Sequence, residues 1–311
     1  MTIVKSFSVG NGDMFAIRHA SDNFTIIDCC LTNENKDNIL RDIEVLGRGK
    51  SIHRFISTHP DEDHILGLEL LDAQKEILNF YCVENQATKK QIQPEHKASF
   101  DKYFELKNDK KKSFYIKQGC SRRWMNLSNE ERESANIDIL FPDRSNEYFR
   151  QALINARNGA SPNNISPIIK CVCENFTFMW MGDLETNFME KIENNVDLCK
   201  VNVLFVPHHG RDTGKVPKSW LEVLDPDLII IGEAPSEHLN YYNGYNTITQ
   251  NSAGDITFFL NSNSLQVYVQ KSSYYTTFKG QKYEANGLYT TKIKGNDFIL
   301  GYKILDLVRK D

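Results

Sequence analysis

Short apolar runs alternate with turn residues through the first 85 positions of the chain. Runs rich in β-branched and aromatic residues predict strands at Ile3–Val9, Met14–Arg18, Phe24–Asp28, Phe55–Ser57 and Ile77–Val83. Apolar residues recur at helical spacing over Glu34–Leu46 and Ile65–Ala73. The pattern in these 85 residues therefore predicts alternating strands and helices.

The second half repeats this pattern. It predicts a helix over Glu185–Ile192 and strands at Ile137–Phe141, Ile168–Cys173, Phe176–Met181, Val201–Val206 and Leu228–Ile231. Two strand-rich halves with helices between them favour an α/β fold of two mixed sheets flanked by helices. We expect one domain over 1–270, with an insert at about 85–135, and a β-rich C-terminal extension over 271–311.

The segment from His59 to His64, His-Pro-Asp-Glu-Asp-His, lies between a predicted strand and a predicted helix. Sites in open α/β sheets usually lie at the carboxyl ends of strands. Imidazoles and carboxylates this close together repel or compete unless a cation binds them, and a divalent metal ion does so. The alternative is an acidic loop that caps a helix and contains two incidental histidines.

Two later strands end in the same chemistry. Phe176–Met181 leads into Gly182-Asp183, and Val201–Val206 leads into Pro207-His208-His209-Gly210. Asp183 alone could cap a helix, but three such strand ends in a chain with eight histidines indicate one shared metal site. The set exceeds the four ligands of a closed zinc site and contains no cysteine, which suits two metal ions bridged by a carboxylate.

These motifs resemble those of the metallo-β-lactamase superfamily. Its His-x-His-x-Asp-His signature is matched by His59, Asp61, Asp63 and His64, with an aspartate in place of the second histidine. That substitution is similar to the soluble domain of ComEC-type DNA-uptake proteins. Further similar motifs are Val9-Gly10-Asn11-Gly12-Asp13, Asn164-Ile165-Ser166 and the segment Thr249–Thr257. The resemblance covers about residues 3–270, with a poorly matched insert near 85–160.

The resemblance implies an αββα sandwich with a two-metal centre. Asp183 would bridge the ions. Asp63 and His64 would hold one ion together with His208 or His209, and His59 and Asp61 would hold the other. The centre would then take Mn²⁺ or Zn²⁺, with Mg²⁺ as a further option, because oxygen-rich sites suit the harder cations.

The second site is expected to be the weaker one, because Asn164 and Ser166 occupy the region where relatives usually place a further histidine. Asp13 is expected to support the ligands from behind. The catalytic candidates are Asp63, His209 and His238. Either the spare imidazole after Pro207 or His238 could contact a phosphate oxygen or protonate a leaving group.

Composition and charge limit the classes of protein to which the chain can belong. The net charge of −4 gives the whole molecule no general attraction to nucleic acid. No apolar run approaches the roughly 20 residues that span a bilayer, and the N-terminus lacks the apolar segment of a secretion signal. We therefore expect a cytoplasmic protein without a membrane partner. The seven cysteines include no Cys-x-x-Cys pair, which argues for buried reduced thiols and against a thiolate zinc site.

A basic stretch interrupts this balance. From Lys89 to Arg123 there are eleven Lys or Arg and four Asp or Glu, a local balance of +7, with aromatic residues interleaved. Such a stretch can track phosphates and stack bases, or it can be a solvated insert whose aromatics pack inward. The candidate nucleic-acid ligands are Lys110, Lys111, Lys112, Arg122 and Arg123.

These observations predict a metal-dependent nuclease acting on DNA, possibly single-stranded. By analogy with the resemblance, it would serve bacterial DNA processing or anti-phage defence. Two alternatives remain. One is a hydrolase of small phosphodiesters such as cyclic nucleotides or phosphorylcholine. The other is a non-catalytic metal-binding module that interacts with other proteins.

Overall fold

A ten-stranded mixed sheet forms one half of the protein in the computed structural model, which describes residues 1–128, 131–233 and 240–308. Its order is β18-β19-β15-β14-β1-β2-β3-β5-β6-β7. The strands span β1 Thr2–Ser6, β2 Phe15–Arg18, β3 Asn23–Ile27, β5 Ile52–Ser57, β6 Phe80–Cys82, β7 Ser113–Tyr115, β14 Ile256–Leu260, β15 Ser264–Val269, β18 Asn286–Ile293 and β19 Asn296–Val308. Strands β3, β5, β6 and β7 run parallel, so their carboxyl ends share one edge.

A six-stranded mixed sheet forms the other half, in the order β13-β12-β11-β10-β9-β8. Its strands span β8 Ile137–Phe141, β9 Ile168–Cys173, β10 Phe176–Trp180, β11 Val203–Phe205, β12 Leu228–Ile231 and β13 Thr247–Thr249. Strands β9 and β10 form an antiparallel hairpin, whereas β10 and β11 run parallel and end at the same edge.

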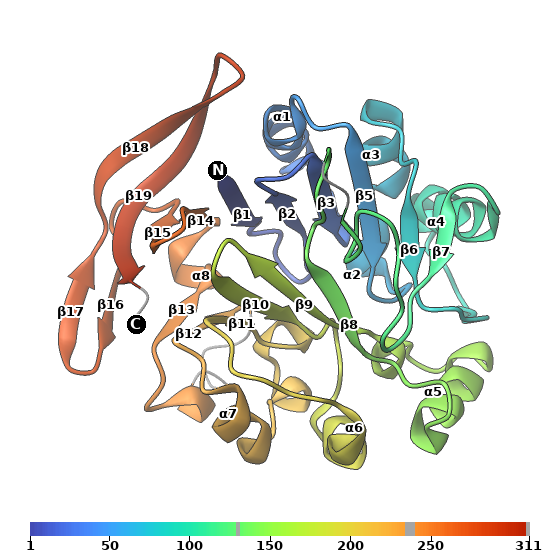
Figure 1. The fold of residues 1–311 in the computed structure, drawn as a ribbon. Coiled ribbons are helices and arrows are strands. Elements are labelled where there is room, and N and C mark those ends of the chain that lie inside the picture. Colours follow the sequence, from blue (N-terminus) through green and yellow to red (C-terminus); the bar gives the residue numbers. More distant parts are fainter. Residues whose placement is uncertain (129–130, 234–239, 309–311) are drawn as a thin grey trace.

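Helices cover the outer face of each sheet (Figure 1). On the first sheet they are α1 Lys36–Gly47, α3 Leu68–Gln74 and α4 Lys97–Asn108; on the second they are α5 Glu147–Arg157, α6 Thr186–Lys191 and α7 Lys218–Leu224. The inner faces of the two sheets share one core, in which Phe15 of β2 packs edge-on against Trp180 of β10. The predicted α/β fold of two mixed sheets flanked by helices is confirmed.

The predicted helix over Ile65–Ala73 is wrong in one respect, because the structure has two helices there. A short helix α2, Glu62–Ile65, ends before Gly67, and α3 begins after it. Gly67 has a φ of 78°, a left-handed value that glycine adopts without a steric penalty. The break lets the His59–His64 loop and α3 point in different directions.

The basic insert joins the first sheet instead of forming a separate layer. Its helix α4 packs on the sheet through Phe100 and Tyr103, which are both buried, and its strand β7 forms the sheet edge. The reading in which the aromatics pack inward therefore holds for these two residues.

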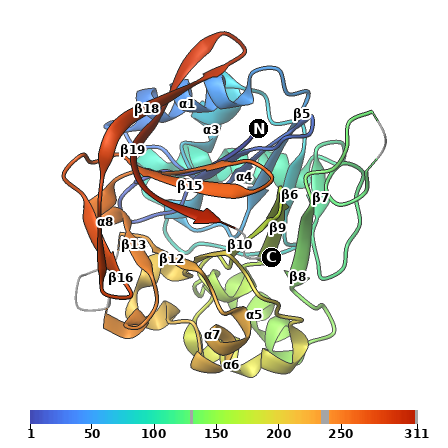
Figure 2. The same cartoon turned by 60° about the vertical axis from the view of Figure 1, so that its left-hand side comes forward.

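The C-terminal residues also continue the first sheet. Strand β19 pairs with β15, and β18 and β19 form a long hairpin along one side of the molecule (Figure 2). A separate two-stranded sheet joins β16, Tyr275–Phe278, to β17, Gln281–Glu284. Within the described residues, no helix is long and apolar enough to cross a bilayer.

Candidate metal centre

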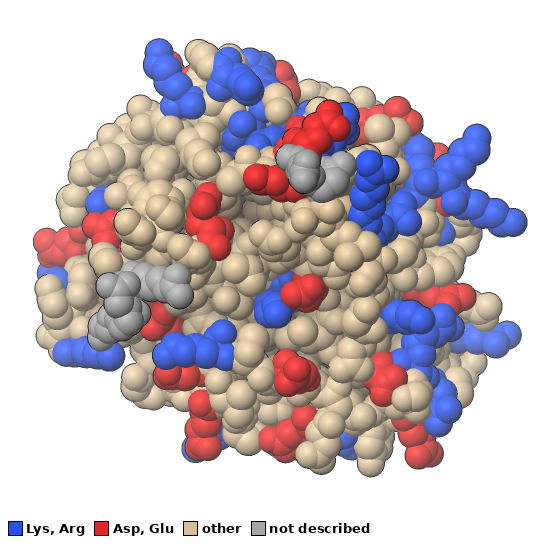
Figure 3. All heavy atoms as spheres, viewed as in Figure 1, with Lys and Arg blue, Asp and Glu red and all other residues tan. Residues whose placement is uncertain are grey.

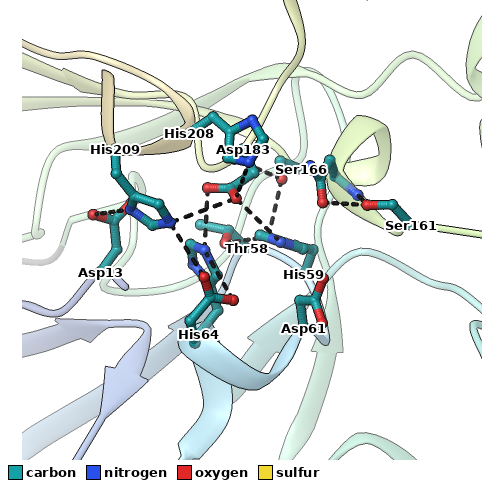
Figure 4. Close-up of polar contacts among 12 residues, drawn as sticks. Asp13, Thr58, His59, Asp61, His64, Ser161, Ser166, Asp183, His208 and His209 are labelled. Carbon is teal, nitrogen blue, oxygen red and sulfur yellow. Dashed lines mark hydrogen bonds and ion pairs between the residues drawn. The ribbon is translucent and has the colours of Figure 1, made fainter. Parts of the chain in front are cut away.

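Three strand ends bring the predicted ligands together at one edge of the sandwich. After β5, the loop provides His59 and the short helix α2 provides His64. The turn after β10 provides Asp183, and the turn after β11 provides His208 and His209 (Figure 4). Parallel strands end at the same edge, so residues far apart in the sequence converge without any long loop. The two sheets meet here, and the ligands lie between them.

Asp183 lies at the middle of the cluster. Its Oδ1 atom is 3.1 Å from His64 Nε2, and its Oδ2 atom is 3.7 Å from the Nε2 atoms of both His208 and His209. His59 Nε2 is 3.9 Å from the same Oδ2. Four imidazoles therefore face one carboxylate that is only 3% exposed.

A second row of carboxylates holds two of these imidazoles from behind. Asp28 Oδ2 lies 2.8 Å from His64 Nδ1, and Asp13 Oδ1 lies 3.1 Å from His209 Nδ1. A carboxylate on one ring nitrogen orients the ring and makes the other nitrogen a better metal ligand. The hydroxyl of Thr58 in turn donates to Asp28 Oδ2 at 2.6 Å, which fixes the carboxylate itself.

The backbone at the site tolerates few other residues. His208 and His209 have φ values of 51° and 55°, left-handed conformations that are costly for residues with a Cβ and that cluster at functional sites. Gly182 has a φ of 50°, and a Cβ there would lie 2.7 Å from Ser166. The close approach of the β10 turn to Ser166 therefore requires glycine.

The protonation of each histidine at the centre depends strongly on its charged neighbours. Burial by itself lowers the pKa of His64, but neighbouring carboxylates, chiefly Asp183, raise it well above its ordinary value. Burial also opposes protonation of His209, but Asp13 and Asp183 raise its pKa to about 10. Burial and the adjacent His64 lower the pKa of His59 to about 4. The centre therefore attracts positive charge, either as protons on these rings or as a cation.

The residues fit a divalent metal ion. Within the described residues, the buried atoms His59 Nε2, His64 Nε2, Asp183 Oδ1 and His209 Nε2 make no hydrogen bond of acceptable geometry, although His64 Nε2 and Asp183 Oδ1 lie only 3.1 Å apart. Buried polar atoms are normally paired, and these four belong to residues grouped around one carboxylate. Ligand atoms of Asp13, His64, Asp183 and His209 lie within 4.8 Å of one another. Imidazole and carboxylate groups suit zinc or manganese.

The other predicted ligands lie closer to the rim. Asp63 Oδ2 is 3.4 Å from His209 Nε2. Asp61 caps α2, and its Oδ1 accepts hydrogen bonds from the Glu62 backbone N–H and from Lys89 Nζ, the latter at 2.7 Å. Asp61 is thus held by a cation on the chain itself, beside His59 (Figure 4).

The residues of the Asn164–Ser166 segment act differently from each other. Ser166 Oγ is 3.2 Å from His59 Nδ1 and also 3.2 Å from the backbone nitrogen of Asp183, so it contacts two members of the cluster. Asn164 instead pairs with the backbone and side chain of Glu185 and stabilises the turn after Asp183. His238 lies outside the described residues.

The structure does not bring the predicted nucleic-acid ligands to this edge. Lys112 directly precedes β7 and pairs with Glu76, at the opposite end of the parallel strands from His59. Lys110 and Lys111 precede it in the same turn.

The two predicted arginines follow β7 in the chain. Arg122 stacks on Phe114, with 4.5 Å from its guanidinium carbon to the ring centroid, and Arg123 stacks on Trp124. The backbone of Trp124 accepts a hydrogen bond from Arg54 within β5, away from the strand's carboxyl end.

Sequence reasoning missed two residues that the geometry makes important. Asp28 was recognisable as an acidic residue at the end of the predicted strand Phe24–Asp28, but its contact with His64 was not predicted. Thr58 precedes His59 and gives no signal of its own. Lys89 belongs to the basic stretch, but its contact with Asp61 depends on how the insert folds back, which no local pattern shows.

Comparison with known proteins gives remote matches only. No protein-family model and no curated protein matches the chain. One similar structure is a Thermotoga maritima protein assigned to the Zn-dependent hydrolases of the metallo-β-lactamase superfamily, with 11% identity, coverage of 76% of this chain and 78% of that chain, and a TM-score of 0.32. Another is a long form of RNase Z from yeast, with 11% identity, coverage of 76% and 37%, and a TM-score of 0.35. At this distance neither likeness identifies the chemistry, so the residues themselves must.

Proposed function

We propose that this chain is a metal-dependent phosphodiesterase of the metallo-β-lactamase type that cleaves DNA. The observation that carries the proposal is the group of buried imidazole and carboxylate atoms without hydrogen-bond partners around Asp183. The resemblance of the His59–His64 and Pro207–Gly210 motifs to those of DNA-uptake proteins supports the choice of a phosphodiester.

The ligands divide into a tight set and a loose set. His64, Asp183 and His209 form the tight set, with Asp13 behind the His209 ring. His59 contacts Asp183 only at 3.9 Å, and its neighbour Asp61 is engaged by Lys89. When bound, two divalent ions would lower the pKa of a water molecule towards neutrality and neutralise phosphate oxygens. The tight set would hold the firmer ion.

The chain's own residues orient the ligands and provide contacts for the substrate. Asp28 and Asp13 hold the rings of His64 and His209 so that their Nε2 atoms face Asp183. At the rim, Arg211 Nη1 lies 3.4 Å from His208 Nε2. A guanidinium beside an imidazole provides donors for a phosphate oxygen.

A cavity beside Asp61 suits the part of the substrate that adjoins the phosphate. It holds about 460 Å³ of empty space, part of it open to solvent, and its lining includes Asp61, Lys89, Phe100 and Phe104. Phe100 is buried against the sheet, but the half-buried ring of Phe104 can stack a base, and a lysine can pair with a phosphate. This combination supports a nucleic-acid strand as substrate.

A small phosphodiester is the second candidate function. It is favoured by the position of Lys112, which lies at the far end of the strands from His59. On the face in Figure 3, Lys and Arg gather mainly toward the side where α4, β7 and α5 lie in Figure 1, interspersed with Asp and Glu. No uniform basic path is visible on that face.

The test is hydrolysis by chelator-stripped protein after addition of Mn²⁺ or Zn²⁺. Labelled single-stranded DNA, plasmid and bis-p-nitrophenyl phosphate are compared. We expect metal-dependent cleavage of DNA, abolished in Asp183→Asn and retained in the matched surface variant Asp138→Asn. Cleavage of bis-p-nitrophenyl phosphate without cleavage of DNA would favour the second candidate function, hydrolysis of a small phosphodiester. Metal binding without hydrolysis of any substrate would contradict the enzymatic proposal.

A further inference from the structure

A second group of metal-ligand side chains lies at the opposite edge of the sandwich. His19 follows β2, and Cys171 and Cys173 belong to β9. One ring nitrogen of His19 and the two sulfur atoms all lie within 4.8 Å of one another. All three residues are buried, with exposures of 4%, 0% and 2%. We call this group the thiol cluster.

The thiol cluster is separate from the candidate metal centre. Cys173 pairs with Phe176 at the start of β10, whereas Asp183 follows the end of that strand. His19 likewise follows the end of β2, whereas Asp13 precedes its start. The two groups therefore lie at opposite ends of the same strands. The thiol cluster also joins the two sheets, because β2 belongs to the first and β9 to the second.

The spacing of the two sulfurs suits a tetrahedral metal ion. They are 3.4 Å apart. With zinc–sulfur bonds of about 2.3 Å, two sulfurs of a tetrahedral site stand about 3.8 Å apart, so a shift of a few tenths of an ångström is enough. Residues i and i+2 of a strand point to the same face, which is why a Cys-x-Cys sequence within β9 can bind one ion.

A hydroxyl group holds the His19 ring in place. Its Nε2 atom contacts the Thr25 hydroxyl at 3.0 Å, and its backbone carbonyl accepts a hydrogen bond from Lys50 Nζ. Burial lowers the pKa of His19 well below its ordinary value, so the ring is neutral at physiological pH. A neutral imidazole and two thiols offer the softer ligand set that zinc accepts.

Solvent can reach the thiol cluster through a cavity. The cavity holds about 500 Å³ of empty space, partly open to solvent, and its lining includes His19, Cys173, Glu133 and Glu174. An ion bound by three protein ligands would have its fourth position available to water or to a group entering from this cavity.

We propose that His19, Cys171 and Cys173 form a zinc site, distinct from the centre at Asp183, that links the two sheets. Each ion would displace the two thiol protons to solvent and form two zinc–thiolate bonds and one zinc–imidazole bond. Because the ion binds only where β2 and β9 are packed together, it would stabilise the folded state. This site is independent of the proposed hydrolase activity.

Cobalt substitution tests the proposal on the unaltered protein. Metal-stripped protein, kept reduced by an agent without thiol groups, is titrated with Co²⁺, and its near-ultraviolet spectrum is recorded. A thiolate-to-cobalt charge-transfer band is expected, at one equivalent per chain. The candidate metal centre contains no cysteine and cannot produce this band. Cobalt binding without the band would overturn the proposal.

Variants then assign the site. Cys171→Ser combined with Cys173→Ser should remove the band and one equivalent of zinc, and should lower the zinc-dependent gain in melting temperature. The control Cys120→Ser replaces another buried cysteine and should change none of these. Asp183→Asn should keep the band while losing metal from the other centre. An unchanged zinc content in the double cysteine variant, or loss of the band in Cys120→Ser, would contradict the assignment.

Discussion

The two edges of the sandwich offer different kinds of ligand, and these come from different strands. At the carboxyl ends of β5, β10 and β11, imidazoles and carboxylates on turns surround Asp183. At the other edge, two thiols within β9 meet a histidine from the other sheet. Turn residues can move to admit a substrate, whereas a strand pair buried between sheets cannot. The first arrangement therefore suits catalysis, and the second suits an ion that links the two sheets.

The largest expected effect is at the carboxylate edge. Asp183→Ala should reduce hydrolysis of every substrate by at least a hundredfold, equivalent to about 3 kcal/mol or more of lost transition-state stabilisation, because four imidazoles lose their common carboxylate. Steady-state rates with DNA and with bis-p-nitrophenyl phosphate provide the measurement. Turnover above a few per cent of the wild-type rate would show that Asp183 is not central to the reaction.

Much of this edge could be predicted from the sequence, and the reason is topological. His59, Asp61, Asp63 and His64 are adjacent in the chain, and parallel strands carry Asp183 and the two histidines after Pro207 to the same edge. The contact of Asp28 with His64 and the contact of Lys89 with Asp61 were not predicted, because each forms through tertiary packing.

The thiol cluster could not be predicted in this way. The chain has no Cys-x-x-Cys pair, and that absence argued against a thiolate site. Cys171 and Cys173 instead share one face of a strand, and His19 meets them only because the two sheets pack together. Six of the seven cysteines are buried and none forms a disulfide, whereas Cys199 is exposed.

A smaller effect concerns the affinities of the two metal sites in the candidate metal centre. Titration with Mn²⁺ should show one ion bound tightly and a second bound at least roughly tenfold more weakly, a gap of about 1.4 kcal/mol. Asp61→His should narrow this gap and favour Zn²⁺, because imidazole suits zinc better than a carboxylate does and the new ring no longer pairs with Lys89. Calorimetry measures both affinities, and two equal sites in the wild type would contradict the division.

The next effect compares lysines near to and far from the centre. Lys89→Gln should weaken DNA cleavage several-fold and reduce the salt dependence by about one phosphate contact, because Lys89 lines the cavity beside Asp61. Changing Lys110, Lys111 and Lys112 to Gln should alter neither quantity. Cleavage rates over a range of salt concentrations distinguish the two. If the triple variant were the more impaired, DNA would have to approach over the opposite end of the strands.

The smallest effect lies at the edge that contains the thiol cluster. Burial lowers the pKa of His53, so below pH 6.5 the unfolded chain binds a proton that the folded chain does not. The free energy of unfolding should therefore fall as the pH drops below 6.5, and less so in His53→Gln. Urea denaturation at pH 7.5 and pH 5.5 measures the difference. An equal loss in both proteins would mean that His53 has the same pKa folded and unfolded.

The most direct test of the central claim is crystallographic. Crystals grown with Mn²⁺ are measured at the manganese absorption edge, and the anomalous difference map locates the ions. We expect the strongest peak among Asp183 Oδ1, His64 Nε2 and His209 Nε2, at bonding distance from each, after small shifts of the side chains. Manganese elsewhere on the protein, with these atoms still without a ligand, would contradict the account.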